Sequence, residues 1–393
     1  MRNPPINARA LGKSGMEALR RGDAHAARVA FEEILAAGQA DASIFLALAY
    51  ACRNLKDADA AMHATDNVLG LEAQNLRALI LKADLLDAAG DARGASAYYR
   101  EVTKVAPPDS TLSAELREQV AHAKLMCEQY AVQFEKFLRD RLAESGLDES
   151  SSSQRFRQSL DILTGKKARY FQEPRYYFFP ELPQIQFFDR NDFPWLDAVE
   201  EQTSAIRAEL LEVLRNDAAF EPYVKGDSAR PTRNKGGMLN NPDWSAFYLW
   251  KNGKEISENV ARCPNTMKAL AGVPLARMNN RSPSILFSLL RPGARIPPHN
   301  GFVNSRLICH LPLVVPRGCS FRVGNEVREW VEGKAWVFDD TIEHEAWNDS
   351  RETRVILLFE VWRPELTSEE RDLVTAMFDA IDTHSGTKQI WEI

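Results

Sequence analysis

The sequence predicts an α+β multidomain protein, with an all-α N-terminal part and a C-terminal antiparallel β sandwich or barrel flanked by helices. Three observations lead to this prediction. Alanine- and leucine-rich segments repeat every 34 residues, a serine-rich stretch follows near residue 150, and short apolar runs dominate the rest. With 393 residues, the chain is long enough for two or three domains and a large core.

The repeats occupy the first 145 residues. The segments GDAHAARVAFEEIL, KDADAAMHATDNVL and GDARGASAYYREVT share an aspartate (Asp23, Asp57, Asp91), an alanine (Ala27, Ala61, Ala95) and a residue four places later (Phe31, Thr65, Tyr99). This pattern resembles the tetratricopeptide repeat, whose helix pairs stack into a curved solenoid because no pair buries its face alone. We expect such a helical domain at 1–145, ending in a helix at about 112–145. A generic helical bundle with accidental periodicity is the alternative.

The composition changes at SGLDESSSSQRF (145–156), which is polar and rich in serine, and we expect a linker at 146–169. Beyond it, apolar alternation is bounded by glycine, proline and asparagine, which is typical of short strands joined by tight turns. These runs are SILFSLL (284–290), RLICHLPLVV (306–315), KAWVFDD (334–340) and RVILLFEVW (354–362). We expect a second domain at 170–393, with helices at about 194–216 and after 367–371 packed on its outer face.

The bulk composition argues against several classes of function. The formal net charge is −6 and no basic stripe is sustained, so we expect no nucleic-acid partner. No apolar run approaches the length of about eighteen residues that a membrane span needs, and the N-terminus lacks the apolar core of a secretory signal. The five cysteines include no CxxC pair. Together these features predict a reduced, cytoplasmic protein that does not bind membranes.

Three histidines lie close together in the second half of the chain. His299 and His310 belong to PPHNGFVNSRLICHLPL, and His344 belongs to DDTIEHEAWN. Neutral imidazole is the commonest metal ligand in proteins. His299 and His344 are about 45 residues apart and each adjoins the end of a predicted strand, an arrangement with which a double-stranded β-helix supplies ligands to iron. A buried polar core and a general base are the alternative interpretations.

Arg354 opens the apolar strand RVILLFEVW, ten residues after His344. A guanidinium that points into a barrel must be paired, because an unpaired buried charge is very costly. A small dicarboxylate matches the planar fork of arginine best. The structural alternative is an ion pair with Glu360, Asp339 or Asp340.

The second half also resembles a known family. The resemblance rests on several sequence segments. They are RYYFFPELPQIQFFDR, DWSAFYLWKNGKEISENVARCPNT, SLLRPGARIPPH and the stretch from HNG at 299 through NSRLICHLPLVV and FDDTIEHEAWN to RPELTSEER. Over roughly residues 170–375 they resemble the aspartyl/asparaginyl β-hydroxylases, which are iron(II)- and 2-oxoglutarate-dependent oxygenases. The resemblance implies a double-stranded β-helix (jelly roll), with Fe(II), 2-oxoglutarate as cosubstrate and dioxygen. Larger members of the family also carry tetratricopeptide repeats ahead of the oxygenase domain.

The resemblance implies roles for individual residues. His299 and His344 match the two iron ligands, and Arg354 matches the residue that binds the distal carboxylate of 2-oxoglutarate. Ser288 and His310 occupy positions that help to hold the same cosubstrate, and Arg306 is a further candidate contact. Trp244 lies where the family lines the substrate entrance.

Two positions call for separate comment. Most 2-oxoglutarate oxygenases add an aspartate two residues after the first histidine, whereas this chain has Gly301, as the type members of the family do. Water could fill the open position, and we expect Asp339 and Asp340 to make strand-end or outer hydrogen bonds. Two residues after Arg306, the type members carry another arginine for the cosubstrate, whereas this chain has Ile308. The orientation or affinity of the cosubstrate is expected to depend on this difference.

The resemblance implies hydroxylation of an unactivated carbon. We expect the β-carbon of Asp or Asn in a peptide, or a related small amino-acid-like molecule, and the solenoid offers a surface for a protein partner. The alternative is a binding or scaffold module whose barrel has lost its chemistry. Gly301 and Ile308 favour that alternative, and the joint presence of Ser288, His299, His310, His344 and Arg354 favours the enzyme.

Overall fold

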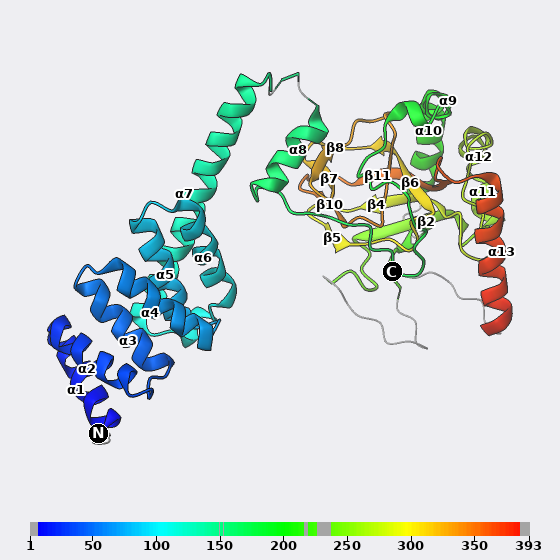
Figure 1. Ribbon diagram of the computed structural model, residues 1–393. Coiled ribbons are helices and arrows are strands. Elements are labelled where there is room, and N and C mark those ends of the chain that lie inside the picture. Colours follow the sequence, from blue (N-terminus) through cyan, green and yellow to red (C-terminus); the bar gives the residue numbers. More distant parts are fainter. Residues whose placement is uncertain (1–6, 149, 152, 216–218, 226–236, 386–393) are drawn as a thin grey trace. The chain divides into compact units, whose positions relative to one another are not determined.

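The computed structural model describes residues 7–148, 150–151, 153–215, 219–225 and 237–385 (Figure 1). The chain divides into two compact units, Met1–Lys166 and Lys167–Ile393. The first unit is helical, and the second contains two antiparallel sheets together with helices. The predicted α+β class is therefore confirmed. Within the described ranges, no helix combines the length and the apolarity that crossing a membrane requires.

In the described residues, the helical unit consists of three helix pairs followed by further helices. Its elements are α1 (Ala8–Arg20), α2 (Ala24–Ala36), α3 (Ala42–Asn54), α4 (Ala58–Leu71), α5 (Leu76–Ala88), α6 (Ala92–Val105), the 3-10 helix η1 (Asp109–Thr111), α7 (Ala114–Glu144) and α8 (Gln154–Leu163). The helices of each pair pack on each other, and each pair packs on the next. This is the stacked arrangement that the 34-residue repeat predicts.

The repeated aspartates begin the second helix of each pair. Asp23, Asp57 and Asp91 are the N-caps of α2, α4 and α6, and each carboxylate accepts a hydrogen bond from the backbone N–H three residues later, at 3.0, 3.1 and 2.9 Å. An N-cap side chain satisfies one of the backbone donors that a helix start leaves without an intrahelical partner. The aspartate recurs every 34 residues because each repeat has to start its second helix in the same way.

The repeated small residues allow the helices to approach closely. Ala27, Ala61 and Ala95 are completely buried. Thr65 replaces the aromatic residue of the other two repeats, and its hydroxyl donates to the carbonyl of Ala61 at 2.7 Å, which satisfies this buried polar group. The middle repeat therefore keeps the close packing with a smaller side chain.

The segment predicted as a linker, 146–169, contains helix α8. Its Leu160 is buried, and Asp161 accepts a hydrogen bond from Arg139 of α7 at 3.1 Å. The helix was not predicted, because the linker was inferred from the serine-rich stretch rather than from the amphipathic sequence QRFRQSLDIL that forms α8.

In the second unit, the described strands form two sheets. They are β1 (Glu221–Pro222), β2 (Trp244–Lys251), β3 (Lys254–Glu255), β4 (Ile285–Leu290), β5 (Arg295–His299), β6 (Arg306–Val314), β7 (Cys319–Val323), β8 (Glu326–Glu329), β9 (Trp336–Phe338), β10 (His344–Asn348) and β11 (Arg354–Trp362). The larger sheet has the order β1-β2-β4-β11-β6-β9, with β3 paired to β2, and the smaller has the order β5-β10-β7-β8. From β4 to β11 this is an eight-stranded jelly roll, as the sequence predicts.

The helices of this unit are α9 (Leu196–Glu201), α10 (Thr203–Leu214), α11 (Ser257–Val260), α12 (Pro264–Ala269) and α13 (Ser368–Ser385), with the 3-10 helix η2 at Arg190–Asp192 (Figure 1). The helix predicted at 194–216 is divided at Gln202 into α9 and α10. Buried residues of both, including Leu196 and Ile206, belong to the same apolar core as the larger sheet. They cover the outer face of that sheet.

Strand alternation separates this core from the pocket. On β6, Leu307, Cys309 and Leu311 pack toward the helices, and on β11 Val355 and Leu357 do the same. The intervening residues on both strands therefore face the smaller sheet, because successive side chains of a strand point to opposite faces. Those residues include Arg306, Ile308, His310 and Arg354, and all of them line one pocket.

The close helix packing predicts that a larger residue at Ala61 destabilises the repeats. We expect Ala61→Leu to lower the free energy of unfolding by about 1–3 kcal/mol, because extra methylenes in a packed interior force neighbours apart. Ala58→Leu, at an exposed position of the same helix, is the matched control. Urea unfolding followed by circular dichroism, with hydrogen exchange of residues 42–105, measures both variants. Equal stability of the two variants would contradict the packing of α4.

Candidate active site

One pocket brings together residues from both sheets of the second unit. Its walls come from the inner faces of β2, β4, β6 and β11 on one side and of β5, β7 and β10 on the other. Every residue that the sequence singled out for iron, cosubstrate or substrate lines it: Trp244, Ser288, His299, Arg306, His310, His344 and Arg354. The structure thus places residues that are up to 110 positions apart around one space.

The two proposed iron ligands are register partners. His344 begins β10 and pairs with His299 at the end of β5, and their ring centres are 4.1 Å apart. Each Nδ1–H donates to the backbone carbonyl two residues earlier, at Pro297 (2.8 Å) and Ile342 (3.1 Å). A carbonyl can only accept, so these bonds fix the tautomer and leave each Nε2 with its lone pair.

Both imidazoles are neutral at physiological pH. Burial lowers the pKa of His299 to about 3, and the neighbouring His344 contributes to that shift. Burial likewise lowers the pKa of His344 to about 4. A neutral imidazole with a free Nε2 is the form that binds a metal, and a hydrogen bond from the other nitrogen orients it. The pair could therefore hold a metal ion.

Arg354 is a buried cation for which the described part of the chain provides no acidic partner. Its residue is 1% exposed, and Nη1 lies 3.2 Å from the carbonyl of Ser288, to which it donates, and 3.4 Å from the Ser288 hydroxyl. Among the described residues, no carboxylate lies within ion-pairing distance of it. Burial lowers its pKa to about 10, so that the guanidinium remains charged at neutral pH. The pocket therefore contains an uncompensated positive charge.

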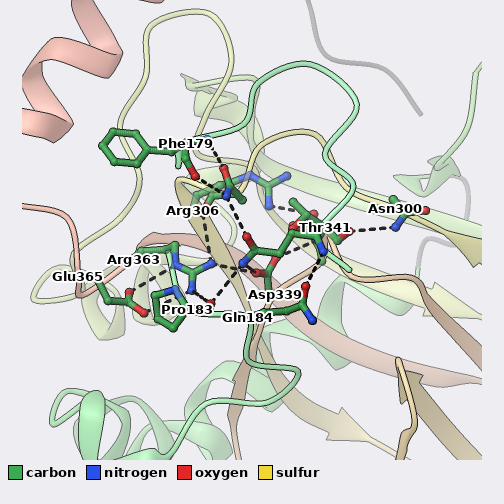
Figure 2. A network of polar contacts seen from close by, with 12 residues as sticks. Phe179, Pro183, Gln184, Asn300, Arg306, Asp339, Thr341, Arg363 and Glu365 are labelled. Atoms are coloured by element: carbon green, nitrogen blue, oxygen red, sulfur yellow. Dashed lines mark hydrogen bonds and ion pairs between the residues drawn. The ribbon is translucent and has the colours of Figure 1, made fainter. Parts of the chain in front are cut away.

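The acidic partners that the sequence suggested for Arg354 belong to other arginines. Arg306 contacts Asp340 at 2.9 Å and Glu360 at 3.1 Å. Arg363 contacts Asp339 at 2.8 Å, within the polar network that Figure 2 shows. The alternative that the sequence left open, an ion pair of Arg354 with Glu360, Asp339 or Asp340, is therefore not formed. Arg306, predicted as a cosubstrate contact, lines the pocket with its charge already balanced.

His310 and Ser288 stand beside Arg354. His310 is 5% exposed, and its Nδ1 is buried without a hydrogen-bond partner among the described residues. Burial lowers its pKa well below the usual value, and the positive charge of Arg354 adds to this effect. The Ser288 hydroxyl also lies 3.4 Å from the indole Nε1 of Trp244. Ser288, His310 and Arg354 thus form a polar region, suited to binding an anion, that is surrounded by aromatic side chains.

Trp244 forms part of an aromatic wall. Its ring stacks on Tyr223 with centres 4.2 Å apart, and its centre lies 5.9 Å from that of His299. Ile308 is 5% exposed and belongs to the apolar cluster that surrounds the pocket. At the position where the resemblance predicted a second arginine, the pocket therefore has an apolar wall.

The space beside Gly301 is filled by Asp340. A Cβ atom added to Gly301 would lie 2.0 Å from Oδ2 of Asp340, so that a side chain at 301 and this carboxylate exclude each other. The backbone N–H of Gly301 donates to the carbonyl of Asp340 at 2.6 Å. Oδ1 of Asp340 is buried and has no hydrogen-bond partner among the described residues. A carboxylate is thus present beside the first histidine, although it comes from the segment after β9.

Three residues of this site were not predicted, or were predicted in another role. Trp330 and Tyr223 line the pocket but carry no motif of their own. Asp340 was expected to make only outer hydrogen bonds. The sequence signal for Asp340 was the pairing of Gly301 with a DD dipeptide just before His344. Among the described residues, no group of three or more His, Cys, Asp or Glu is arranged to hold a metal ion.

The chain is similar in sequence to proteins named as hydroxylases. The human aspartyl/asparaginyl beta-hydroxylase is 34% identical over 223 residues, which are 56% of this chain and 26% of that protein. The ornithine lipid ester-linked acyl 2-hydroxylase of Rhizobium tropici is 34% identical over 180 residues, 45% of this chain and 60% of that protein. The chain thus spans less than two thirds of the length of either relative.

The helical unit has structural neighbours of its own. One is the first TPR domain of human RPAP3, which is 15% identical, has a TM-score of 0.27, and covers 31% of this chain and 96% of that chain. In the second unit, residues 200–364 match the model of the family described as Aspartyl/Asparaginyl beta-hydroxylase. In its sequence and its jelly-roll fold, the C-terminal unit of this chain is thus similar to the aspartyl/asparaginyl β-hydroxylase family, and both relatives given above are named as hydroxylases.

Proposed function

We propose that the chain is an iron(II)- and 2-oxoglutarate-dependent dioxygenase that hydroxylates an unactivated carbon. The observation that carries this proposal is one pocket that combines two neutral, register-paired histidines with a buried arginine free of any described carboxylate. The histidines supply metal-binding lone pairs, and the arginine supplies charge for an acidic cosubstrate.

The residues present suit both groups. Nε2 of His299 and of His344 would hold Fe(II), and the unpartnered Oδ1 of Asp340 would accept a hydrogen bond from water near it. Arg354 would bind one carboxylate of 2-oxoglutarate, with the Ser288 hydroxyl and His310 Nδ1 as further polar contacts. Once bound, iron and 2-oxoglutarate supply with dioxygen the oxidising power for the hydroxylation.

The chain itself contributes orientation and exclusion of water. The Nδ1–H bonds to Pro297 and Ile342 hold the imidazole rings, and the aromatic wall around Trp244 shields the pocket. No side chain is required as an acid–base pair or a nucleophile. A dry pocket limits side reactions of the protein itself.

For the substrate, we propose the β-carbon of Asp or Asn in a peptide, or a small amino-acid-like molecule, in the cytoplasm. The name of the human relative supports this class, and the name of the Rhizobium tropici relative shows that lipids are also hydroxylated by proteins of similar sequence. The ring centre of Trp244 lies 5.9 Å from that of His299, which supports the proposal that Trp244 contacts the substrate. The helical unit offers a surface on which a protein partner could bind.

A binding or scaffold module is the second candidate. The apolar Ile308 in the pocket wall favours it, because the resemblance predicts a cosubstrate arginine there. The two candidates differ in whether the pocket forms a complex with iron and 2-oxoglutarate, and this difference can be measured directly.

Anaerobic addition of Fe(II) and 2-oxoglutarate tests the proposed function. We expect the weak visible charge-transfer band of the chelate, loss of iron binding in His344→Ala, and retained iron in Arg354→Ala. Because charge-assisted hydrogen bonds contribute about 1.5–3 kcal/mol, Arg354→Ala should weaken 2-oxoglutarate binding by roughly 10- to 100-fold. His384→Ala, an exposed histidine of α13, is the control. Absence of both the band and substrate-independent succinate formation in the wild type would exclude the enzyme.

The buried arginines should differ in their effect on stability. Arg306→Met leaves Asp340 and Glu360 without their cation, and we expect a loss of about 3–5 kcal/mol in the free energy of unfolding. Arg354→Met leaves no described carboxylate unpaired, so the ligand-free variant should be at least as stable as the wild type. Urea unfolding at neutral pH, without metal or 2-oxoglutarate, compares them. Similar losses in both variants would argue that Arg354 has a structural partner.

The exclusion between Gly301 and Asp340 can be measured by a double-mutant cycle. We expect Gly301→Ala to lower the melting temperature in the wild type, because the new methyl group overlaps the Asp340 carboxylate. The same substitution should have little effect in an Asp340→Ala background, where that carboxylate is absent. Equal shifts in the two backgrounds would show that the carboxylate moves aside freely.

A further inference from the structure

We infer that Trp330 is a positioning residue for the cosubstrate: the face of its indole holds the Arg354 guanidinium in place and leaves its charge available to the carboxylate of 2-oxoglutarate. This inference rests on the proposed function and adds a residue that neither the motifs nor the resemblance assign a role.

The other buried arginines of the chain can be compared with Arg354. Among the residues that the structure describes, the four largest fully buried side chains are those of Arg281, Arg306, Arg354 and Arg363. Three of them contact carboxylates, which lie on the segments around them: Asp382 for Arg281 at 2.9 Å, and the partners of Arg306 and Arg363 given above. All four guanidinium carbons lie over aromatic rings, at 4.8 Å from the ring centre for Arg281 on Phe378, 6.0 Å for Arg306 on Phe302, 5.1 Å for Arg363 on Phe188 and 4.8 Å for Arg354 on Trp330. Arg354 differs because, within the described part of the chain, its ring contact is not accompanied by a carboxylate.

The position of Trp330 is fixed from several sides. It directly follows β8 and is 5% exposed. Its ring stacks against Phe321, with centres 5.5 Å apart and planes at 30°, and against Trp336 at 5.9 Å and 21°. His310, a second residue of the proposed cosubstrate site, has its ring centre 6.2 Å away. A side chain packed in this way can hold the arginine in one orientation before any ligand binds.

An aromatic face and a carboxylate hold a cation with different consequences. A carboxylate occupies the donor fork of the guanidinium and cancels its charge, as Asp340 and Glu360 do for Arg306. A ring face attracts the cation through its quadrupole, by about 0.5–2 kcal/mol, and leaves the N–H edge free. For Arg354, the hydrogen bonds given above are both made by Nη1, to the carbonyl and hydroxyl of Ser288, and neither acceptor carries a charge. The free edge then serves an incoming carboxylate.

Calorimetric titration of the full-length protein, loaded with Mn(II) in place of iron, with 2-oxoglutarate tests the inference. We expect Trp330→Leu to weaken 2-oxoglutarate binding at least about tenfold and to leave Mn(II) affinity unchanged, whereas a structural lesion would weaken both. Trp195→Leu, which removes a partly buried indole beside Phe359 on the helix-covered side, is the matched control and should leave both affinities unchanged.

A second experiment uses replacements of Trp330 that preserve the shape of the side chain and therefore the fold. Site-specific replacement of Trp330 by tryptophans with increasing numbers of ring fluorines retains the shape but withdraws charge from the ring face. Because the interaction with the guanidinium depends on that charge, 2-oxoglutarate affinity should fall stepwise with each added fluorine. The same replacements at Trp195 should have no effect.

The outcomes separate the two proposals. A wild-type protein that binds Mn(II) and 2-oxoglutarate, with an affinity that neither fluorination nor Trp330→Leu changes, would overturn the role of Trp330 and leave the proposed function standing. Equal loss of Mn(II) and 2-oxoglutarate binding in Trp330→Leu, with no graded effect of fluorination, would also overturn it. A wild-type protein that binds no 2-oxoglutarate would overturn the proposed function and this inference together.

Discussion

The alternation of side chains along β4, β6 and β11 is the constraint on which the second unit depends. One set of positions packs against α9 and α10 and forms the main core, and the other set faces the smaller sheet and lines the pocket. The core residues fix the strands in register, and the register then determines which polar residues meet. His299 and His344 face each other for this reason, although 44 residues lie between them in the sequence.

The buried arginines of this unit differ in whether a carboxylate balances their charge. Arg306 and Arg363 are held by carboxylates from the segment that follows β9, and this tethers the segment to β6 and to the chain after β11 (Figure 2). These pairs cost desolvation but recover it through mutual attraction and hydrogen bonds. Arg354 has no such compensation among the described residues. The desolvation of its guanidinium therefore lowers the stability of the folded state. A buried charge without a carboxylate partner, beside the unpartnered Nδ1 of His310 in the same pocket, is an arrangement that suits a binding site for an anion.

Much of this arrangement could be predicted from the sequence, for identifiable reasons. The 34-residue spacing of Asp23, Asp57 and Asp91 predicted the helix pairs, because each repeat needs the same cap. The alternating runs predicted β4, β6, β9 and β11, because one face of each strand had to be apolar. Ser288, His299, His310, His344 and Arg354 were singled out, and the structure brings them to one pocket.

Other features could not be predicted, because they depend on contacts between distant segments. Helix α8 is held by Arg139 and by burial of Leu160, neither of which a serine-rich composition indicates. The partners of the buried arginines depend on which of several nearby carboxylates reaches each guanidinium, and the sequence left an ion pair of Arg354 open as the alternative to a ligand. The role inferred for Trp330 follows only from the place of its ring beneath that arginine.

The contact between Gly301 and Asp340 also limits how such a site can change over time. A carboxylate can stand at either position, but the overlap at 2.0 Å prevents both from being occupied as they now stand. A substitution at either position therefore changes which side chains the other position can hold. A motif search that demands an aspartate two residues after the histidine would overlook this chain, which has Gly301 there.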